Sequence, residues 1–380
     1  MDFELTEEMK MLKEMAYKFA VAQVKPVSQE CDEHEKYLPE IRIKAAQNGL
    51  VGAWIPEEYG GPGAGILGHA IITEEISKID MGIGLNIVAS GFGCESILNY
   101  GTEKQKKTYL PPICEGVKVS AGAYTEPNAG TDVSGYKTRA VKDGNDYIIN
   151  GNKMFITNGM VCDFMVAQCI TNPEEKKHNS FSLIIIPADA KGVTRNKLHG
   201  KMGIRASDTA EIALEDVRVP QSNLVGKEGH GFRQLMHFFD VTRVMVSGQA
   251  LGLSEACLET SIKYVKERTA FGAPLGSYQM TQMKLTEMAI RIEALRGLVY
   301  KAAWLIDQGK PDYTLAAMAK FYGGQTAVFC ANYAVELHGG YGYIDEYPVQ
   351  KWYRDAKILE LYEGTKEAEI MTIGRALQAR

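Results

Sequence analysis

Apolar residues recur every three or four positions in several stretches of the first third of the chain, which predicts amphipathic helices. The first stretch spans 9–20, with Thr6 as its N-cap and two glutamates suited to its first turn. A second spans 41–46 and stops at an Asn-Gly pair, and a third spans 71–79. Between them, 56–63 is dense in Pro and Gly and is expected to be a loop.

The run Gly82–Gly93 is unusual because it is rich in small residues, among them Ala89, Ser90 and Gly91. Small side chains at this density usually indicate close backbone packing, although they can also leave room for a ligand.

The middle of the chain changes to a β pattern. Apolar residues at 147–149 precede Asn150-Gly151, which predicts a two-residue hairpin followed by a second strand at 153–157. Further strands are expected at 164–170, 181–186 and 212–220. Because the connections are too short for crossover helices, roughly 123–220 is expected to form a small antiparallel β-domain.

Long helical patterns return in the last third, at about 231–267, 278–307 and 312–337, with two shorter ones on either side of Glu363. The predicted fold is therefore mainly α with a central β-domain. Its expected parts are an N-terminal helical domain (1–121), a middle β-domain (122–230) and a C-terminal helical domain (231–380). A cleft is expected where the helical layers meet the β-domain, and interdomain clefts are favoured ligand sites.

Composition limits the class of protein. The chain has 380 residues, 45% hydrophobic and 23% charged, and a net charge of −5 that gives no reason to expect nucleic acid or an anionic membrane as partner. Its seven cysteines are scattered and form no Cys-x-x-Cys pair, which favours a reducing compartment. The acidic N-terminus resembles no targeting peptide, and no apolar run has membrane-spanning length. A cytoplasmic protein without membrane insertion is expected.

Common cofactor motifs are missing. There is no strand-Gly-x-Gly-x-x-Gly-helix unit, no P-loop, and no zinc-ligand spacing among the seven histidines, so no metal is expected. A different feature stands out near the end of the chain. Glu363 lies in the connection 361–365 between two packed helices, beside Tyr362 and Gly364. A carboxylate in such a setting suits a general base, although a solvated loop acid has the same pattern.

Two further segments carry polar groups that suit a ligand. In 124–132, Thr125, Thr131 and the turn amides offer donors to phosphate or to the edge of a heterocycle. In 153–159, Phe155 and Thr157 lie two residues apart, so an aromatic plane and a hydroxyl share one strand face and suit a flat ring system. By composition alone, the first segment is more typical of an ordinary turn.

Taken in order, these segments resemble the acyl-CoA dehydrogenase flavoprotein family, from about residue 5 to the end. The matching pieces are Pro-Glu-Glu-Tyr-Gly-Gly (56–61), Tyr-Thr-Glu-Pro-Asn-Ala-Gly-Thr-Asp (124–132), Asn-Gly-Asn-Lys-Met-Phe-Ile-Thr-Asn-Gly (150–159), Gly-Ile-Arg-Ala-Ser-Asp-Thr (203–209), Val-Gly-Lys-Glu-Gly-His-Gly-Phe (225–232), Glu-Arg-Thr-Ala-Phe-Gly (267–272), Leu-His-Gly-Gly-Tyr-Gly (337–342), Arg-Asp-Ala-Lys (354–357) and Tyr-Glu-Gly-Thr (362–365).

The resemblance implies non-covalently bound FAD, an acyl-CoA substrate, an electron-transfer flavoprotein as acceptor and a homotetramer. It carries FAD contacts over to Tyr124, Thr125, Thr131, Phe155, Thr157, Arg268, Phe271, Gln279, Glu336, Gly339, Gly340, Thr365 and Glu367, those from Arg268 to Gly340 serving a neighbouring subunit. It carries substrate contacts over to Thr131, Phe239, Asp240, Arg243 and Gly364.

The chain departs from the family pattern at three of these positions. Thr131 stands where many relatives have Ser, and Phe155 replaces a common Trp, which keeps the aromatic plane but loses the indole donor. Glu336 stands where Gln is usual, and a carboxylate facing FAD phosphates is electrostatically unfavourable.

The family takes its catalytic base either from the Tyr-Glu-Gly-Thr loop or from a long-helix position that here is Thr242, which cannot serve. The resemblance therefore implies Glu363 as the base of an α,β-dehydrogenation. Alternatives are an enoyl-CoA reductase or another flavoenzyme of the same fold, and a non-catalytic acyl-CoA-binding member. The acyl group is left open between short or medium linear chains and branched or alicyclic acids.

Overall fold

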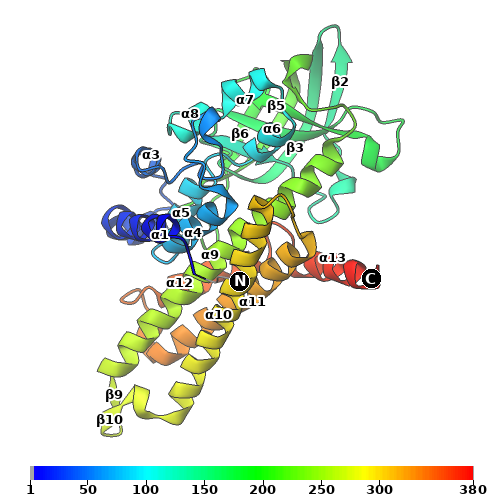
Figure 1. The fold of residues 1–380 in the computed structure, drawn as a ribbon. Coiled ribbons are helices and arrows are strands. Elements are labelled where there is room, and N and C mark those ends of the chain that lie inside the picture. The colour runs from blue at the N-terminus through cyan, green and yellow to red at the C-terminus, as the bar shows by residue number, and fades with distance from the viewer. Residues whose placement is uncertain (1–3, 380) are drawn as a thin grey trace.

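The computed structural model describes residues 4–379, so residues 1–3 and 380 of the expected domains lie outside the described part. Helices come first, strands occupy the middle, and long helices follow (Figure 1). The family-type fold expected from the sequence, helices around a central β-domain, is confirmed.

The N-terminal helices lie where the apolar patterns predict them. Thr6 caps the first, its hydroxyl oxygen accepting a hydrogen bond from the Met9 amide at 3.3 Å. The helices are α1 (Glu7–Phe19), α2 (Ser28–Glu33), α3 (Pro39–Gln47), α4 (Gly65–Ser77), α5 (Met81–Val88), α6 (Cys94–Tyr100), α7 (Glu103–Tyr109) and α8 (Pro111–Cys114).

The small residues after α5 are closely packed. A Cβ added to Gly91 would lie 3.1 Å from Ile113, and one added to Gly93 would lie 3.2 Å from Val166. Gly93 also has a left-handed φ of +97°, which suits glycine. Of the two interpretations of this segment, close packing is the one that these contacts favour.

The middle strands form one sheet in the order β6-β7-β3-β2-β4-β5-β8, with β1 added beside β4. Most neighbours are antiparallel, as expected, but β1 and β2 each pair with β4 in parallel. The strands are β1 (Ser120–Ala123), β2 (Arg139–Asp143), β3 (Asp146–Thr157), β4 (Phe164–Ile170), β5 (Phe181–Pro187), β6 (Val193–Lys197), β7 (Thr209–Pro220) and β8 (Leu224–Val225).

The hairpin predicted at Asn150-Gly151 is wrong. The turn lies earlier, at Gly144-Asn145, and β3 continues through Asn150-Gly151 because it pairs with β2 and β7 at once. At this point the register with β7 shifts, and the Asn150 side chain exchanges two hydrogen bonds with Asp216. A Cβ on Gly151 would lie 2.4 Å from the Thr138 hydroxyl. The Asn-Gly pair therefore marks a bulge with close backbone approach.

The C-terminal helices are α9 (Gly231–Glu267), α10 (Gln279–Asp307), α11 (Tyr313–His338), α12 (Val349–Ala356) and α13 (Lys366–Gln378), and a short hairpin of β9 (Thr269–Ala270) and β10 (Ala273–Pro274) follows α9. In Figure 1, α9 begins beside the sheet and runs with α10 and α11 to the far end of the molecule, where β9 and β10 lie. The last helix, α13, projects away from this bundle. No helix in the described part of the chain is both long and apolar enough to cross a membrane.

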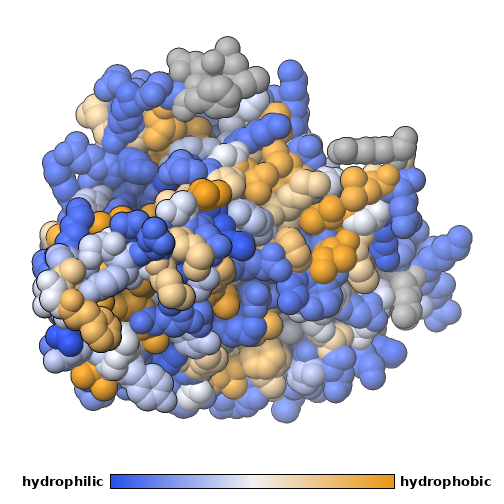
Figure 2. All heavy atoms as spheres, turned by 90° about the horizontal axis from the view of Figure 1, so that it is seen from below, coloured by the Kyte–Doolittle hydropathy of each residue, from blue (hydrophilic) through white to orange (hydrophobic). Residues whose placement is uncertain are grey.

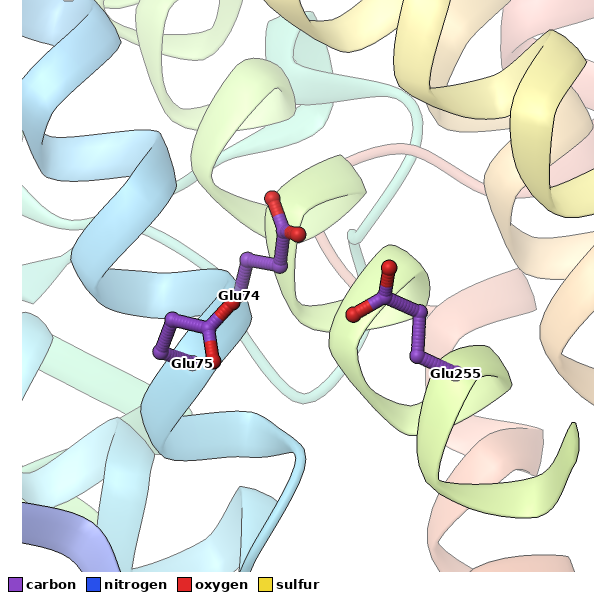
Figure 3. A group of neighbouring side chains, drawn as sticks. All are labelled: Glu74, Glu75 and Glu255. Atoms are coloured by element: carbon purple, nitrogen blue, oxygen red, sulfur yellow. The ribbon is translucent and has the colours of Figure 1, made fainter. Parts of the chain in front are cut away.

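The junction of α4 and α9 combines close packing with buried charge. The carboxylates of Glu74 and Glu75 on α4 and Glu255 on α9 come within 4.8 Å of one another (Figure 3). Salt bridges from Lys13 and Arg296 to Glu74, and from Lys78 and Arg296 to Glu255, balance these charges. The cluster is therefore accounted for as a structural ion network between the helices.

Gly252 allows α9 to approach α4 at this network, and its replacement should be costly. A Cβ there would lie 2.0 Å from the Glu74 carbonyl oxygen, so Gly252→Ala must push the helices apart and should lower the free energy of unfolding by about 1–3 kcal/mol. Gly297→Ala on α10 is the matched control, because an added Cβ meets nothing within 4 Å; it should raise stability by up to about 1 kcal/mol. Denaturant unfolding measures both, and equal effects would contradict the close approach.

Candidate active site

Glu363 lies in a strained connection between a 3₁₀ turn (Lys357–Glu360) and α13. Its φ is +55°, a left-handed conformation that costs a non-glycine residue about 1–2 kcal/mol, and Gly364 follows with φ +106°. Thr365 then caps α13, its hydroxyl oxygen accepting from the Ala368 amide at 3.3 Å. Such strain persists where the surroundings impose it, and it is common at functional sites.

The Glu363 carboxylate is tied to α9. The Thr242 hydroxyl donates a hydrogen bond to its Oε2, so the residue at the family's other base position contacts the carboxylate itself. Glu363 remains partly accessible by surface area, yet protein atoms surround it closely. This desolvation raises the pKa of Glu363 to about 6, against the opposing effects of Thr242, Arg243 and Lys320.

Charged side chains pack beneath this loop. Asp240 and Arg243 on α9 form a salt bridge of 2.9 Å, and Arg243 Nε lies 3.1 Å from Glu369 Oε1 on α13. Lys320 on α11 donates a hydrogen bond to the Gly364 carbonyl oxygen. Arg243 is buried and its ion pairs are internal, so its predicted contact with the CoA portion stays a prediction.

The same part of α9 reaches the 124–132 turn. The Phe238 ring lies 5.0 Å from that of Tyr124, and Phe239 lies 6.3 Å from it. Burial raises the pKa of Tyr124, with contributions from the charges of Glu95 and Glu363. The structure thus brings Glu363, Phe239 and Tyr124 together around the start of α9.

A buried ion pair fixes the 124–132 turn, which composition alone left open as an ordinary turn. The Glu126 carboxylate accepts hydrogen bonds from the Lys137 and Thr138 amides and from Lys153 Nζ at 3.0 Å. Lys153 also donates to the Tyr124 carbonyl oxygen at 3.1 Å. The Thr125 carbonyl oxygen accepts from the Met154 amide at 2.9 Å, which joins the turn to β3 just before Phe155.

At the end of β3, Phe155 presents an aromatic plane to solvent. Its side chain is 67% exposed and its φ is +58°, while the register with β7 shifts between Lys153 and Ile156. Thr157 is half-buried beside it on the strand, and Thr131 is exposed in the turn. The exposed Phe155 ring, the nearby Thr131 and Thr157 hydroxyls, and a buried Tyr124 hydroxyl that has at most Ser96 beside it fit a flat, polar-edged group such as a flavin.

The remaining predicted cofactor contacts gather at the far end of the bundle. Arg268, Glu336, Gly339 and Gly340 line a cavity of about 450 Å³ there. Phe271, at the β9–β10 hairpin, is fully exposed, and Gln279 begins α10. The β9–β10 end of the bundle, where these residues lie, is remote from the start of α13 and hence from the Glu363 loop of the same chain (Figure 1).

Three of these residues, Glu336, Gly339 and Gly340, bear on the fit of a phosphate-containing cofactor. Lys284 Nζ donates to Glu336 at 2.5 Å, so the carboxylate that departs from the family pattern is neutralised within the chain. An added Cβ at Gly339 or Gly340 meets nothing within 4 Å, which leaves their backbone open to a ligand. Glu367 is exposed in the first turn of α13, near Thr365.

Sequence reasoning gave no role to Lys153, Glu126, Lys320, Glu369 or Glu95. Burial and the nearby Glu363 charge raise the pKa of Glu95 to about 8, and its carboxylate accepts from the Gly93 amide at 2.8 Å. The only advance signal was a charged residue within an otherwise apolar helical or strand pattern, as at Lys320.

The comparisons agree with this architecture. Three family models match the chain in order, described as the acyl-CoA dehydrogenase N-terminal domain (residues 6–117), middle domain (121–217) and C-terminal domain (229–378). An acryloyl-CoA reductase (NADH) of Anaerotignum propionicum is 41% identical over 100% of this chain and 97% of its own length.

Two solved structures also match the whole chain. Butyryl-CoA dehydrogenase from Megasphaera elsdenii has a TM-score of 0.97 and 39% identity, with 100% of both chains covered. A chain solved in work on the electron transferring flavoprotein of Acidaminococcus fermentans has a TM-score of 0.98 and 41% identity, again over 100% of both chains. The chain belongs to the acyl-CoA dehydrogenase family, a flavoprotein family of enzymes that act on CH–CH bonds.

The ion pair that fixes the 124–132 turn yields a prediction about stability. Glu126→Gln leaves the buried Lys153 without its carboxylate, which should lower the free energy of unfolding by about 3 kcal/mol. Glu228→Gln is the control, since its partner Lys142 is half-exposed and the pair should contribute less than about 1 kcal/mol. Denaturant unfolding compares the two, and a loss at Glu126 no larger than at Glu228 would show that the buried pair does not fix the turn.

Proposed function

We propose that the chain catalyses the FAD-dependent α,β-dehydrogenation of an acyl-CoA thioester to the 2-enoyl-CoA, with Glu363 as the base. The observation that carries this proposal is the Glu363 carboxylate, held in a left-handed loop, hydrogen-bonded to Thr242 and with its pKa raised to about 6. A base is most effective when its pKa is near the working pH, and burial moves this carboxyl toward neutrality.

The chemistry requires three things of the protein. Glu363 removes the α-proton and ends the step as a carboxylic acid. The developing enolate oxygen needs donors, for which the Glu363 backbone N–H is our candidate, as in an oxyanion hole. The cofactor, held by Tyr124, Thr125, Thr131, Phe155, Thr157, Thr365 and Glu367, supplies the acceptor for the β-hydride when bound.

The substrate-binding residues are part of the same proposal. Phe239 and Asp240 lie next to Thr242 on α9. Gly364 follows the base directly and packs against Glu369, since an added Cβ would come within 2.0 Å of that carboxylate, and we assign its backbone to the substrate site. Butyryl-CoA, named in a structural relative, supports a short linear acyl chain. The closely packed Gly91 and Gly93 give no added support to a branched or alicyclic acid.

A reductase is the second candidate. A relative at 41% identity is an acryloyl-CoA reductase, and the raised pKa of Glu363 leaves a useful fraction of the protonated acid near neutral pH. In that direction Glu363 would donate the proton to the α-carbon of an enoyl-CoA.

Assembly and partner are further parts of the proposal. Apolar side chains remain exposed on α10 and α13, among them Met280, Trp304 and Ile370, and Figure 2 shows orange patches among polar surroundings on one face of the molecule. They support a homotetramer in which Arg268, Phe271, Gln279, Glu336, Gly339 and Gly340 complete a neighbour's FAD site. We also propose that an electron-transfer flavoprotein accepts the electrons and that the protein is cytoplasmic. The proposed domain boundaries are 1–121, 122–230 and 231–380.

The test of this function is anaerobic flavin bleaching. The flavin absorbance of protein purified with FAD should fall within a single turnover when butyryl-CoA is added. A panel of other thioesters, namely octanoyl-, isobutyryl- and cyclohexanecarbonyl-CoA, is tested in the same way. A protein that binds no flavin, or whose flavin no thioester reduces, would contradict the proposal. Faster reoxidation by an enoyl-CoA than reduction by an acyl-CoA would favour the reductase.

Replacing the base isolates its role. Glu363→Gln keeps size and hydrogen-bonding shape but cannot accept a proton, so it should retain FAD and thioester binding and lose about 10³-fold or more in the rate of flavin reduction. Stopped-flow absorbance measures the rate, and thioester-induced changes in the flavin spectrum measure binding. Reduction at close to the wild-type rate would exclude Glu363 as the base.

The reaction should also depend on pH in a defined direction. Because Glu363 must be ionised to accept the proton and its pKa in the free enzyme is about 6, kcat/KM should rise with pH through about 6 and then level off. A pH series of initial rates at low thioester concentration measures this limb. A value of kcat/KM that is constant from about pH 5 to 7 would contradict the assigned pKa.

A further inference from the structure

Lys320 is a buried charge that the proposed reaction does not use directly. It lies on α11 with only 1% of its surface exposed, and its Nζ donates to the carbonyl oxygen of Gly364. That carbonyl directly follows the left-handed residue Glu363. Burying an ammonium group is costly unless it is paired and hydrogen-bonded, so this lysine is held by specific partners.

Glu369 packs against the same loop at Gly364. It has no exposed surface, lies in the first turn of α13 and is paired with Arg243. Its Oε1 lies so close to Gly364 that an added Cβ would be 2.0 Å away. The N-terminal end of a helix favours a carboxylate, which helps to keep Glu369 in place.

The charges around the loop are unequal in sign. Asp240, Glu363 and Glu369 supply carboxyl groups, while Arg243 and Lys320 supply the cations. Glu360, at the edge, pairs with Lys357 at 2.5 Å. Burial also raises the pKa of Asp240 to about 6 and lowers that of Lys320 to about 8. Proton binding at Glu363 is therefore coupled to these neighbours on α9, α11 and α13, and to Glu95 on α6, whose own pKa the Glu363 charge raises.

We propose that Lys320 and Glu369 are positioning residues for Glu363: Lys320 holds the loop through the Gly364 carbonyl, and the two opposite charges balance the field at the Glu363 carboxylate. This inference rests on the proposed function, because it assigns both residues to the base of that reaction. Neither side chain touches the substrate in this account.

The two residues act on Glu363 in opposite directions, which gives a sharp test. The Lys320 ammonium lowers the pKa of Glu363, and the Glu369 carboxylate raises it. The rate of flavin reduction is measured against pH, and the acid limb of this profile reports the pKa of Glu363. Lys320→Met should therefore move this limb to higher pH by about one unit, and Glu369→Gln should move it to lower pH by a similar amount. The double variant should lie between them. Shifts in the same direction, or no shift in either, would overturn the proposal.

The loop contact predicts a second effect, on rate. Lys320→Met releases the Gly364 carbonyl and should lower the limiting rate of flavin reduction by about 10- to 100-fold, since small displacements of a catalytic group are costly. The control is Lys351→Met, which removes another buried lysine whose ion-pair partners are Asp80 and Asp355 and not residues of the Glu363 loop. This variant should lower the melting temperature and leave the acid limb of the pH profile where it is in the wild type. A limb displaced to the same extent in the control would contradict a specific role for Lys320.

The holoenzymes of all variants are measured with butyryl-CoA or the faster thioester from the panel, alongside melting temperature and FAD content. If Lys320→Met fails to fold, Glu369→Gln, which keeps the side-chain volume, decides alone by the direction of its shift. If no thioester bleaches the wild type, the proposed function fails instead. Hydrogen exchange of the Tyr362 and Glu369 amides, which donate to the Ile358 and Thr365 carbonyl oxygens on either side of the loop, then tests the contact. Lys320→Met should speed this exchange by about tenfold or more, and unchanged exchange would contradict a role for Lys320 in holding the loop.

Discussion

The left-handed backbone at Glu363 and Gly364 is the constraint on which the site depends. A glutamate does not adopt this conformation cheaply, so contacts from three helices must maintain it. Thr242 binds the carboxylate from α9, Lys320 binds the following carbonyl from α11, and Glu369 fills the space beneath Gly364 from α13. The same contacts that impose the strain also set the charge around the carboxylate.

The long helix α9 connects this loop with the β-domain. Its first turns carry Phe238 and Phe239, which contact Tyr124, and one turn later Thr242, which contacts Glu363. The buried pair of Glu126 and Lys153 fixes the turn that contains Tyr124 to β3. The proposed base and the surface suited to a flat ring are thereby positioned by one long helix, although they come from distant parts of the sequence.

Much of this was predictable from periodicity. The ends of α9, the strands β4 and β5, and the N-cap at Thr6 follow directly from apolar spacing and capping chemistry. The failure at Asn150-Gly151 has a physical cause, since a hairpin signal and a bulge use the same residues and only pairing with two neighbouring strands decides between them. Roles for Lys320 and Glu369 could not be predicted either, because their partners are distant in sequence and a lone charge in a helix is usually solvated.

The central claim is that Glu363 accepts the α-proton of a bound thioester. Deuterium incorporation measures this step alone if the enzyme is incubated in D₂O with an acyl-CoA whose β-carbon is replaced by sulfur, so that no hydride can leave. The wild type should incorporate deuterium at the α-carbon, and Glu363→Gln should do so at least about 10³-fold more slowly. Equal incorporation by both proteins would contradict the account.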